Sequence, residues 1–293
     1  MEKKSLGLKI AQFPLTRIVV GIAVVVFIYT VSQRLLFGLL QSVSLSKEAS
    51  DLLIGIIAVA LVIVVYRILF KAYEKRTVTE LSIHGIGKPI GMGLLLGSLL
   101  LSTTILILLL NGSFTVVSAN PFLFIVPGFT LALTSAIFEE ILLRGILFRI
   151  MEEKLGSIIA LIISALIFGA MHLANPNSSL IAALAIAMEA GLLLAAAYMY
   201  TRNLWFPIAI HFAWNFTQSG IFGATVSGIT LEKSLLTSQT QGAEWFTGGS
   251  FGPEASVPAT LLCLIAATVL LILCYREKKF IRPFWKKAEA RLD

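Results

Sequence analysis

Long apolar runs dominate the sequence and constrain its fold more than any other feature. A helix that spans a bilayer needs about 20 mainly apolar residues, and the chain contains about eight runs of roughly that length. They lie near residues 18–40, 52–70, 90–111, 121–150, 157–173, 179–201, 203–221 and 257–275. The sequence therefore predicts an all-α, multi-pass membrane protein with about eight transmembrane helices.

Composition narrows the class of protein further. Of the 293 residues, 57% are hydrophobic and only 13% are charged, whereas an average soluble domain has roughly 25% charged residues. A soluble globule with so few charges would lack polar surface, so the composition excludes a cytosolic enzyme, a nucleic-acid binder and a disordered chain. We expect a single transmembrane domain over residues 1–293, with the lipid bilayer as its partner and no nucleic acid.

The basic residues predict an orientation. If the N-terminus is cytoplasmic, nineteen of the 23 Lys and Arg residues fall in cytoplasmic segments, and only Lys47 and Lys233 fall outside. Such a bias is what the positive-inside rule describes. We therefore expect an integral membrane protein with both termini in the cytoplasm. The first apolar run continues through Arg34 with no small-residue cleavage site, so we interpret it as a retained helix.

A few ionisable or strongly polar residues interrupt the apolar runs. Each such group is costly in a bilayer unless it is paired or hydrated, and it is a candidate functional residue for that reason. They gather in four consecutive runs and include two of the three histidines. The set is Glu139, Glu140, Arg144, His172, Glu189, His211 and Asn215.

Helical geometry predicts how these side chains meet. Glu140 and Arg144 are four residues apart, so they lie on one helix face and can pair. Glu139 is rotated by about 100° and escapes that pairing. Glu140 lies sixteen residues before Gly156 and His172 lies sixteen residues after it. If the chain turns at Gly156, both lie about 24 Å from the turn and can meet at one depth.

These residue types suit the hydrolysis of an acyl bond. A carboxylate in apolar surroundings is a competent base toward water, and an imidazole can share the proton. A second imidazole and a carboxamide, one helical turn apart at His211 and Asn215, can donate to the oxyanion of a tetrahedral intermediate. Each residue also has a structural interpretation: Glu140 with Arg144 as an ion pair, and Glu189 as a polar packing contact beside Gly191.

Three short motifs carry a resemblance to a known family. AIFEEILLRG (136–145) looks like an EExxxR motif, FGAMH (168–172) like FxxxH and HFAWN (211–215) like HxxxN. In this order, within apolar helices, they resemble the CPBP family of CAAX prenyl proteases and bacteriocin-processing membrane proteins, in its Rce1-like form. The resemblance covers about residues 121–220, which we expect to be the catalytic core.

The resemblance implies an all-helical intramembrane endopeptidase. Carried over, Glu139 activates water together with His172, while His211 and Asn215 form the oxyanion hole. Glu140 and Arg144 support them, with Phe168 in the second motif. The requirement for a metal stays open: if a divalent ion such as zinc takes part, the expected ligands are Glu139, His172 and His211.

Three functions from different classes remain as hypotheses. The first is an endopeptidase that cleaves a membrane-associated peptide or protein, in a bacterial plasma membrane. The second is a non-catalytic immunity or regulatory protein of the same family. The third, a proton or ion carrier, is less favoured because no broken-helix repeat is present. Glu189 departs from the apolar pattern expected before Gly191 and adds a charge to the site.

Overall fold

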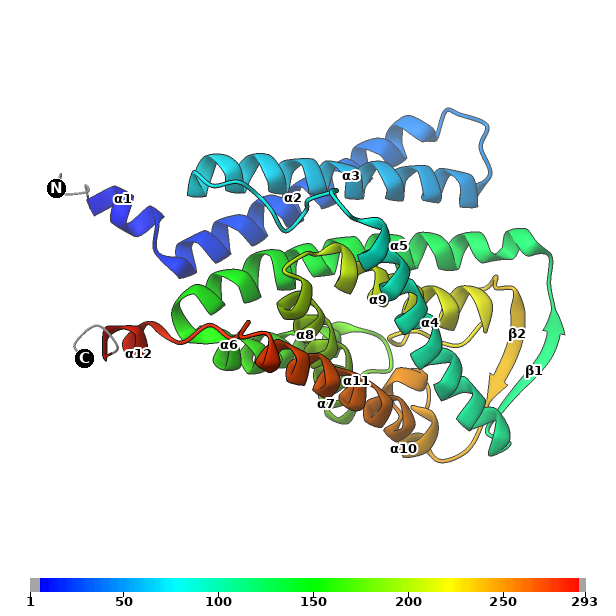
Figure 1. Ribbon diagram of the computed structural model, residues 1–293. Helices are drawn as coiled ribbons and strands as arrows, with labels where there is room; N and C mark the ends of the chain where they lie inside the picture. The colour runs from blue at the N-terminus through cyan, green and yellow to red at the C-terminus, as the bar shows by residue number, and fades with distance from the viewer. Residues whose placement is uncertain (1–5, 290–293) are drawn as a thin grey trace.

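The structure is a computed structural model that describes residues 6–289. Helices make up most of this range (Figure 1). Those of the first half are α1 (Leu6–Ala11), α2 (Pro14–Leu40), α3 (Lys47–Glu74), α4 (Gly87–Leu110), η1 (Phe122–Ile125), α5 (Val126–Glu140), η2 (Ile141–Phe148) and α6 (Arg149–Met171). Those of the second half are η3 (His172–Ala174), α7 (Leu180–Ile186), η4 (Ala187–Gly191), α8 (Leu192–Thr201), α9 (Trp205–Asn215), η5 (Phe216–Ile221), α10 (Glu244–Thr247), η6 (Pro253–Ala255), α11 (Val257–Arg276) and α12 (Phe284–Glu289).

The described part of the chain contains one small β-sheet. Strands β1 (Phe114–Ala119) and β2 (Leu236–Thr240) pair antiparallel, with a register shift between Val116 and Ser118. Figure 1 places this sheet at the end of the molecule opposite the two chain ends. It ties the segment after α4 to the segment that follows η5.

Six helical stretches are long and apolar enough to cross a membrane. The chain is thus an all-α, multi-pass membrane protein, as the sequence predicts. The count of eight stays a prediction, because two of the expected runs, 121–150 and 157–173, lie in one stretch of 53 residues, Phe122–Ala174. That stretch is interrupted at Gly156, whose φ of 78° and ψ of 167° are not helical. The run expected at 203–221 is formed by α9 and η5.

Local sequence signals explain where several helices begin. The Ser46 and Ser256 hydroxyls accept hydrogen bonds from the third following backbone N–H, at the first turns of α3 and α11. Ser179 does the same for α7. Proline follows the start of α2 and α11, where its missing N–H costs no hydrogen bond.

Close helix packing places α9, which carries two of the motif residues. Helix α4 has the small-residue pattern Gly93-x-x-x-Gly97 on the side that faces α9. A Cβ atom on Gly93 would lie 2.6 Å from the Ala209 Cβ and 2.8 Å from the Phe206 carbonyl oxygen. Only glycine therefore lets the α4 and α9 backbones approach this closely.

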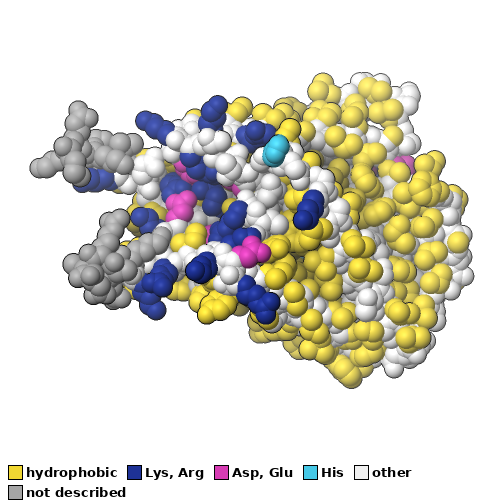
Figure 2. Space-filling view, in the orientation of Figure 1, with side chains coloured by type: hydrophobic (Ala, Val, Ile, Leu, Met, Phe, Trp, Pro, Cys, Tyr) yellow, Lys and Arg dark blue, Asp and Glu magenta, His cyan; other side chains and the backbone are white. Residues whose placement is uncertain are grey.

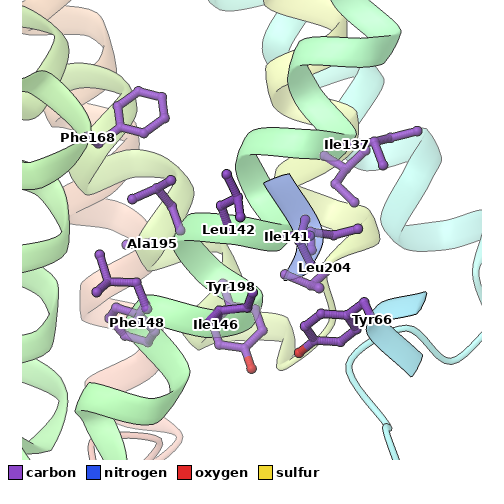
Figure 3. Close-up of a cluster of buried hydrophobic side chains, with 14 of the residues drawn as sticks. Tyr66, Ile137, Ile141, Leu142, Ile146, Phe148, Phe168, Ala195, Tyr198 and Leu204 are labelled. Carbon is purple, nitrogen blue, oxygen red and sulfur yellow. The ribbon is translucent and has the colours of Figure 1, made fainter. Parts of the chain in front are cut away.

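The largest buried cluster surrounds η2, a π-helical segment. In Figure 3, Ile141, Leu142 and Ile146 of η2 point among side chains that include Tyr66 of α3 and Tyr198 of α8. A π-helical turn is one residue wider than an α-helical turn and is frequent at functional sites. Here the Gly145 carbonyl oxygen gains side-chain partners, at 2.8 Å from both the Tyr66 hydroxyl and Arg149 Nε.

Charged side chains gather at the end of the molecule where both chain ends lie (Figure 2). Glu74 is 2.5 Å from Arg17 and 2.9 Å from Arg149, and Arg17 is also 2.7 Å from Glu153. These ion pairs tie α2, α3 and α6 together. Glu80 lies beside them; burial alone would raise its pKa, but hydrogen bonds from Arg76 and Tyr66 outweigh burial and hold the pKa below its ordinary value.

Candidate active site

The first motif lies where α5 gives way to η2. Glu140 and Arg144 are almost completely buried, and Arg144 Nη1 lies 2.8 Å from Glu140 Oε1, so the pair predicted from helical spacing is present. Arg144 also donates to the carbonyl oxygens of Ala190 and Gly191, at 3.0 and 3.1 Å. Arg144 therefore fastens η2 to η4, where Glu189 lies.

His211 of α9 lies between the two carboxylates of the first motif. Its Nδ1 is 3.1 Å from Glu140 Oε1, and its Nε2 is 4.0 Å from Glu139 Oε2. The first distance is a hydrogen bond, and because a carboxylate accepts, Nδ1 donates it. The second distance exceeds a direct hydrogen bond, so His211 Nε2 lies near Glu139 without being bonded to it.

His172 is held by its own helix. Its Nδ1 lies 2.8 Å from the Phe168 carbonyl oxygen, so Nδ1 carries the proton and Nε2 is left with its lone pair. The Phe168 ring contacts both imidazoles, with centroid distances of 4.8 Å to His172 and 6.2 Å to His211. Arg144 stacks over the same ring at 4.6 Å. Phe168 thus positions the second motif against the other two.

Asn215 is positioned by α5. Its Nδ2 donates to Ser135 Oγ at 3.2 Å, which links the third motif to the helix that carries the first. The π-helical segment η5 begins at the next residue. Each of the three π-helical segments, η2, η4 and η5, therefore contains or directly adjoins a polar residue predicted from the sequence.

A small cavity joins part of this set. It has a volume of about 40 Å³, enough for a few water-sized groups. Five of the sequence-predicted residues line it: Phe168, His172, Glu189, His211 and Asn215. The cavity is not lined by Glu139, Glu140 or Arg144. The two glutamates lie beside His211, and Arg144 lies over the Phe168 ring. His211 and Phe168 both line the cavity.

Comparison with known families supports the motif assignment. The family described as Rce1-like, type II CAAX prenyl endopeptidase Rce1-like, matches residues 121–217. This segment is Rce1-like. The match contains all three motifs and covers about a third of the chain. No curated protein and no solved structure matches the chain.

The cavity extends beyond the Rce1-like segment. Ser227 and Glu254 also line it, and both come from the 222–256 segment. The Glu254 carboxylate accepts hydrogen bonds from Gln218 Nε2 and the Ser227 backbone N–H, and burial raises its pKa to about 7. Glu254 was not predicted from the sequence, because it lies in a loop, whereas the predicted site residues lie inside apolar runs. Its position three residues before the last apolar run was the available signal.

The 222–256 segment is fastened over the end of α6 rather than merely connecting two helices. Asn175 Nδ2 donates to the Ser227 carbonyl oxygen at 3.1 Å, and Gly228 packs against Pro176 with no room for a side chain. The Gly228 N–H donates to the Phe251 carbonyl oxygen at 2.7 Å. These contacts place Glu254 at the cavity that His172 and His211 also line.

The expected zinc ligands do not form a metal site in the described residues. No group of three or more His, Cys, Asp or Glu side chains within 6–289 is arranged to hold a metal ion. Glu139 Oε2 lies 4.0 Å from His211 Nε2, and no ion pair joins Glu139 to His172 among the described residues. In this arrangement Glu139, His172 and His211 are not gathered around one metal position.

Proposed function

We propose that the protein is an intramembrane endopeptidase that hydrolyses a peptide bond of a membrane-associated peptide or protein with an activated water molecule. The observation that carries the proposal is the placement of His211, 3.1 Å from Glu140 and 4.0 Å from Glu139, with its ring on the cavity shared with His172 and Asn215. The Rce1-like match over the same residues supports the reaction class.

The water molecule is activated at the edge of the cavity. Glu139 accepts a proton from a water molecule bound at its Oε2, and the water oxygen forms a bond to the carbonyl carbon of the substrate. His172 Nε2, which is free of protein partners, accepts the second hydrogen bond of this water. The carbonyl π bond breaks and its electron pair moves to the oxygen.

The oxyanion is stabilised from α9. Asn215 donates through its amide, and His211 donates through Nε2 once it has taken up the proton relayed from Glu139. Collapse of the intermediate breaks the C–N bond, and the same proton passes to the leaving nitrogen. The products are a carboxylic acid and an amine, and the enzyme returns to its starting state.

The buried ion pair keeps these groups in place. Glu140 binds His211 Nδ1 and Arg144 at the same oxygen, which fixes the orientation of the imidazole ring. Arg144 is in turn held by two carbonyl oxygens of η4 and by the face of Phe168. Both residues act through His211 and are positioning residues.

We place the enzyme in a bacterial plasma membrane, with both termini in the cytoplasm. The orientation is supported by the gathering of Lys and Arg at the end of the molecule that carries the chain ends (Figure 2). The positive-inside rule assigns that end to the cytoplasm. The β1–β2 sheet and the 222–256 segment then face the opposite side of the membrane.

Cleavage by the purified full chain tests the proposal. The protein is reconstituted in lipid nanodiscs and incubated with a set of membrane-associated peptides, and products are identified by mass spectrometry. We expect cleavage by the wild type and by Glu232→Gln, an exposed control in the 222–256 segment, and none by Glu139→Ala or His172→Ala. Undiminished cleavage in both alanine variants would refute the mechanism. A wild type that cleaves nothing supports the non-catalytic alternative.

A further inference from the structure

Two carboxylates outside the three motifs face the cavity. Glu189 comes from the π-helical segment η4, and Glu254 comes from η6, just before α11. Each side chain belongs to a residue that is only 2% exposed. His172, His211 and Asn215 line the same cavity, so both acids lie beside the reacting groups.

Neither acid has a cationic partner among the described residues. No Lys or Arg is among the described residues that line the cavity, and neither Glu189 nor Glu254 belongs to any ion pair found within residues 6–289. Glu189 Oε2 is fully buried and has no hydrogen-bond partner in the part of the chain that the structure describes. A buried carboxyl group without a partner is unfavourable, and a cation bound in the cavity would supply a partner to Glu189.

Hydrogen bonds within the protein fix the position of the Glu254 carboxylate. Gln218 Nε2 and the Ser227 N–H donate to its carboxylate, so its orientation does not depend on a ligand. Burial raises the pKa of Glu254 to about 7. A cation in the cavity therefore suffices to ionise it at neutral pH.

The remaining wall of the cavity is apolar. Phe168, Ile186, Leu193 and Trp214 are among the apolar residues that line it. An apolar wall that ends in carboxylates fits an aliphatic stem that carries a positive charge, and the aromatic faces favour a cation as well. An ammonium group is a compact point charge on an aliphatic stem, and it suits a narrow apolar cavity that presents two carboxylates.

We propose that Glu189 and Glu254 form a subsite that binds the ammonium group of a substrate lysine next to the scissile bond. The subsite deepens the endopeptidase function proposed above and rests on it for the identity of the ligand as a peptide side chain. It places one substrate-binding residue, Glu254, outside the Rce1-like segment.

Binding of a small probe tests the subsite without requiring cleavage. The full chain in nanodiscs is titrated with n-butylammonium chloride, which copies the end of a lysine side chain, and with uncharged n-butanol. The rise in the thermal unfolding temperature with concentration gives a dissociation constant for each probe. We expect the wild type and the loop control Glu232→Gln to bind n-butylammonium at least tenfold more tightly than n-butanol.

Two variants assign that preference to the carboxylates. We expect Glu189→Gln to weaken n-butylammonium binding at least tenfold and Glu189→Gln/Glu254→Gln to abolish the preference, with n-butanol binding unchanged. Equal affinities for the two probes in the wild type would overturn the proposal, and so would an unchanged preference in Glu189→Gln. Glu254→Gln removes hydrogen bonds to Gln218 and Ser227 and could prevent folding. In that case Glu189→Gln by itself tests the subsite, because Glu189 Oε2 has no hydrogen bond to lose among the described residues.

Cleavage assays separate failure of the subsite from failure of the proposed function. Peptides that differ only in lysine, arginine or norleucine at each position near the scissile bond are compared. We expect lysine to be preferred at one position by at least tenfold, and the preference to be lost in Glu189→Gln/Glu254→Gln. Cleavage without n-butylammonium binding or a lysine preference would refute the subsite alone. Ammonium binding without any cleavage would refute the endopeptidase function alone.

Discussion

Glu140 and His211, 71 residues apart in the chain, are joined by a hydrogen bond of 3.1 Å between Glu140 Oε1 and His211 Nδ1. This bond connects the first and third motifs inside the helical bundle. It leaves His211 Nε2 directed to Glu139, at 4.0 Å, so a single imidazole lies between a buried, paired carboxylate and a more accessible one. The two glutamates are adjacent in sequence but have different environments and different roles.

Loss of the buried arginine should destabilise the protein. Arg144→Met leaves the fully buried Glu140 without its cation, and breaking a buried ion pair in this way costs about 3–5 kcal/mol. Unfolding in mixed micelles of increasing sodium dodecyl sulfate measures the change. The control Arg67→Met, at an exposed position of α3, should have almost no effect. Equal stability of the two variants would show that the Glu140–Arg144 pair does not support the fold.

The break in the 53-residue helical stretch requires glycine. At Gly156, φ is 78°, and an added Cβ would lie 2.8 Å from the Ile281 carbonyl oxygen. We expect Gly156→Ala to cost about 1–3 kcal/mol in unfolding free energy through backbone strain. Gly91→Ala in α4, where no atom lies near the added Cβ, should be neutral or slightly stabilising. A neutral Gly156→Ala would mean that the chain does not turn there.

Asn215 should affect the chemical step more than substrate binding. Asn215→Ala removes an oxyanion donor, so we expect kcat to fall about 100-fold with little change in KM. Ser135→Ala, which removes only the group that accepts the Asn215 hydrogen bond, should lower kcat less than tenfold. Michaelis–Menten kinetics on one cleaved peptide measure both effects. An increase in KM at constant kcat in Asn215→Ala would assign Asn215 to ground-state binding instead.

Glu254 should make the protein less stable as pH rises. Its pKa is 4.5 when unperturbed and about 7 in the folded protein. Between these values the folded state holds a proton that the unfolded state has lost, so the unfolding free energy falls by about 1.4 kcal/mol per pH unit, or about 3 kcal/mol in total. The contribution is complete below pH 4.5 and is lost above about pH 7.

A comparison with Glu254→Gln isolates this effect. His172, Glu189, His211 and Cys263 face the same cavity in both proteins, so the difference between the two stability curves belongs to Glu254. Unfolding measured from pH 4.5 to pH 8 should show the wild type losing stability relative to the variant. A difference that does not change with pH would contradict the prediction.

The apolar runs and the three motifs predicted much of the fold class and the family. Long apolar segments have few alternatives to spanning helices, which is why the all-α, multi-pass class could be predicted. The i,i+4 pairing of Glu140 with Arg144 followed from helical geometry alone. The number of spans is harder to predict, because a single glycine at 156 separates two apolar runs that otherwise form one stretch.

The parts that could not be predicted depend on long-range contacts in the loops. The pairing of β1 with β2 joins segments more than 110 residues apart, and neither strand alternates strongly. Glu254 reaches the cavity only because Gly228 packs on Pro176 and Asn175 binds Ser227. The three π-helical segments also rotate the side chains that follow them away from the positions expected for a regular α-helix.

In the proposed mechanism, Glu139 activates the water that attacks the peptide bond. The most direct measurement is kcat of Glu139→Gln on a peptide that the wild type cleaves, beside the exposed control Glu232→Gln. We expect kcat to fall by about 10²–10⁴-fold in Glu139→Gln while the unfolding free energy stays within about 0.5 kcal/mol of the wild type. A Glu139→Gln variant that folds and keeps more than a tenth of wild-type kcat would contradict the account.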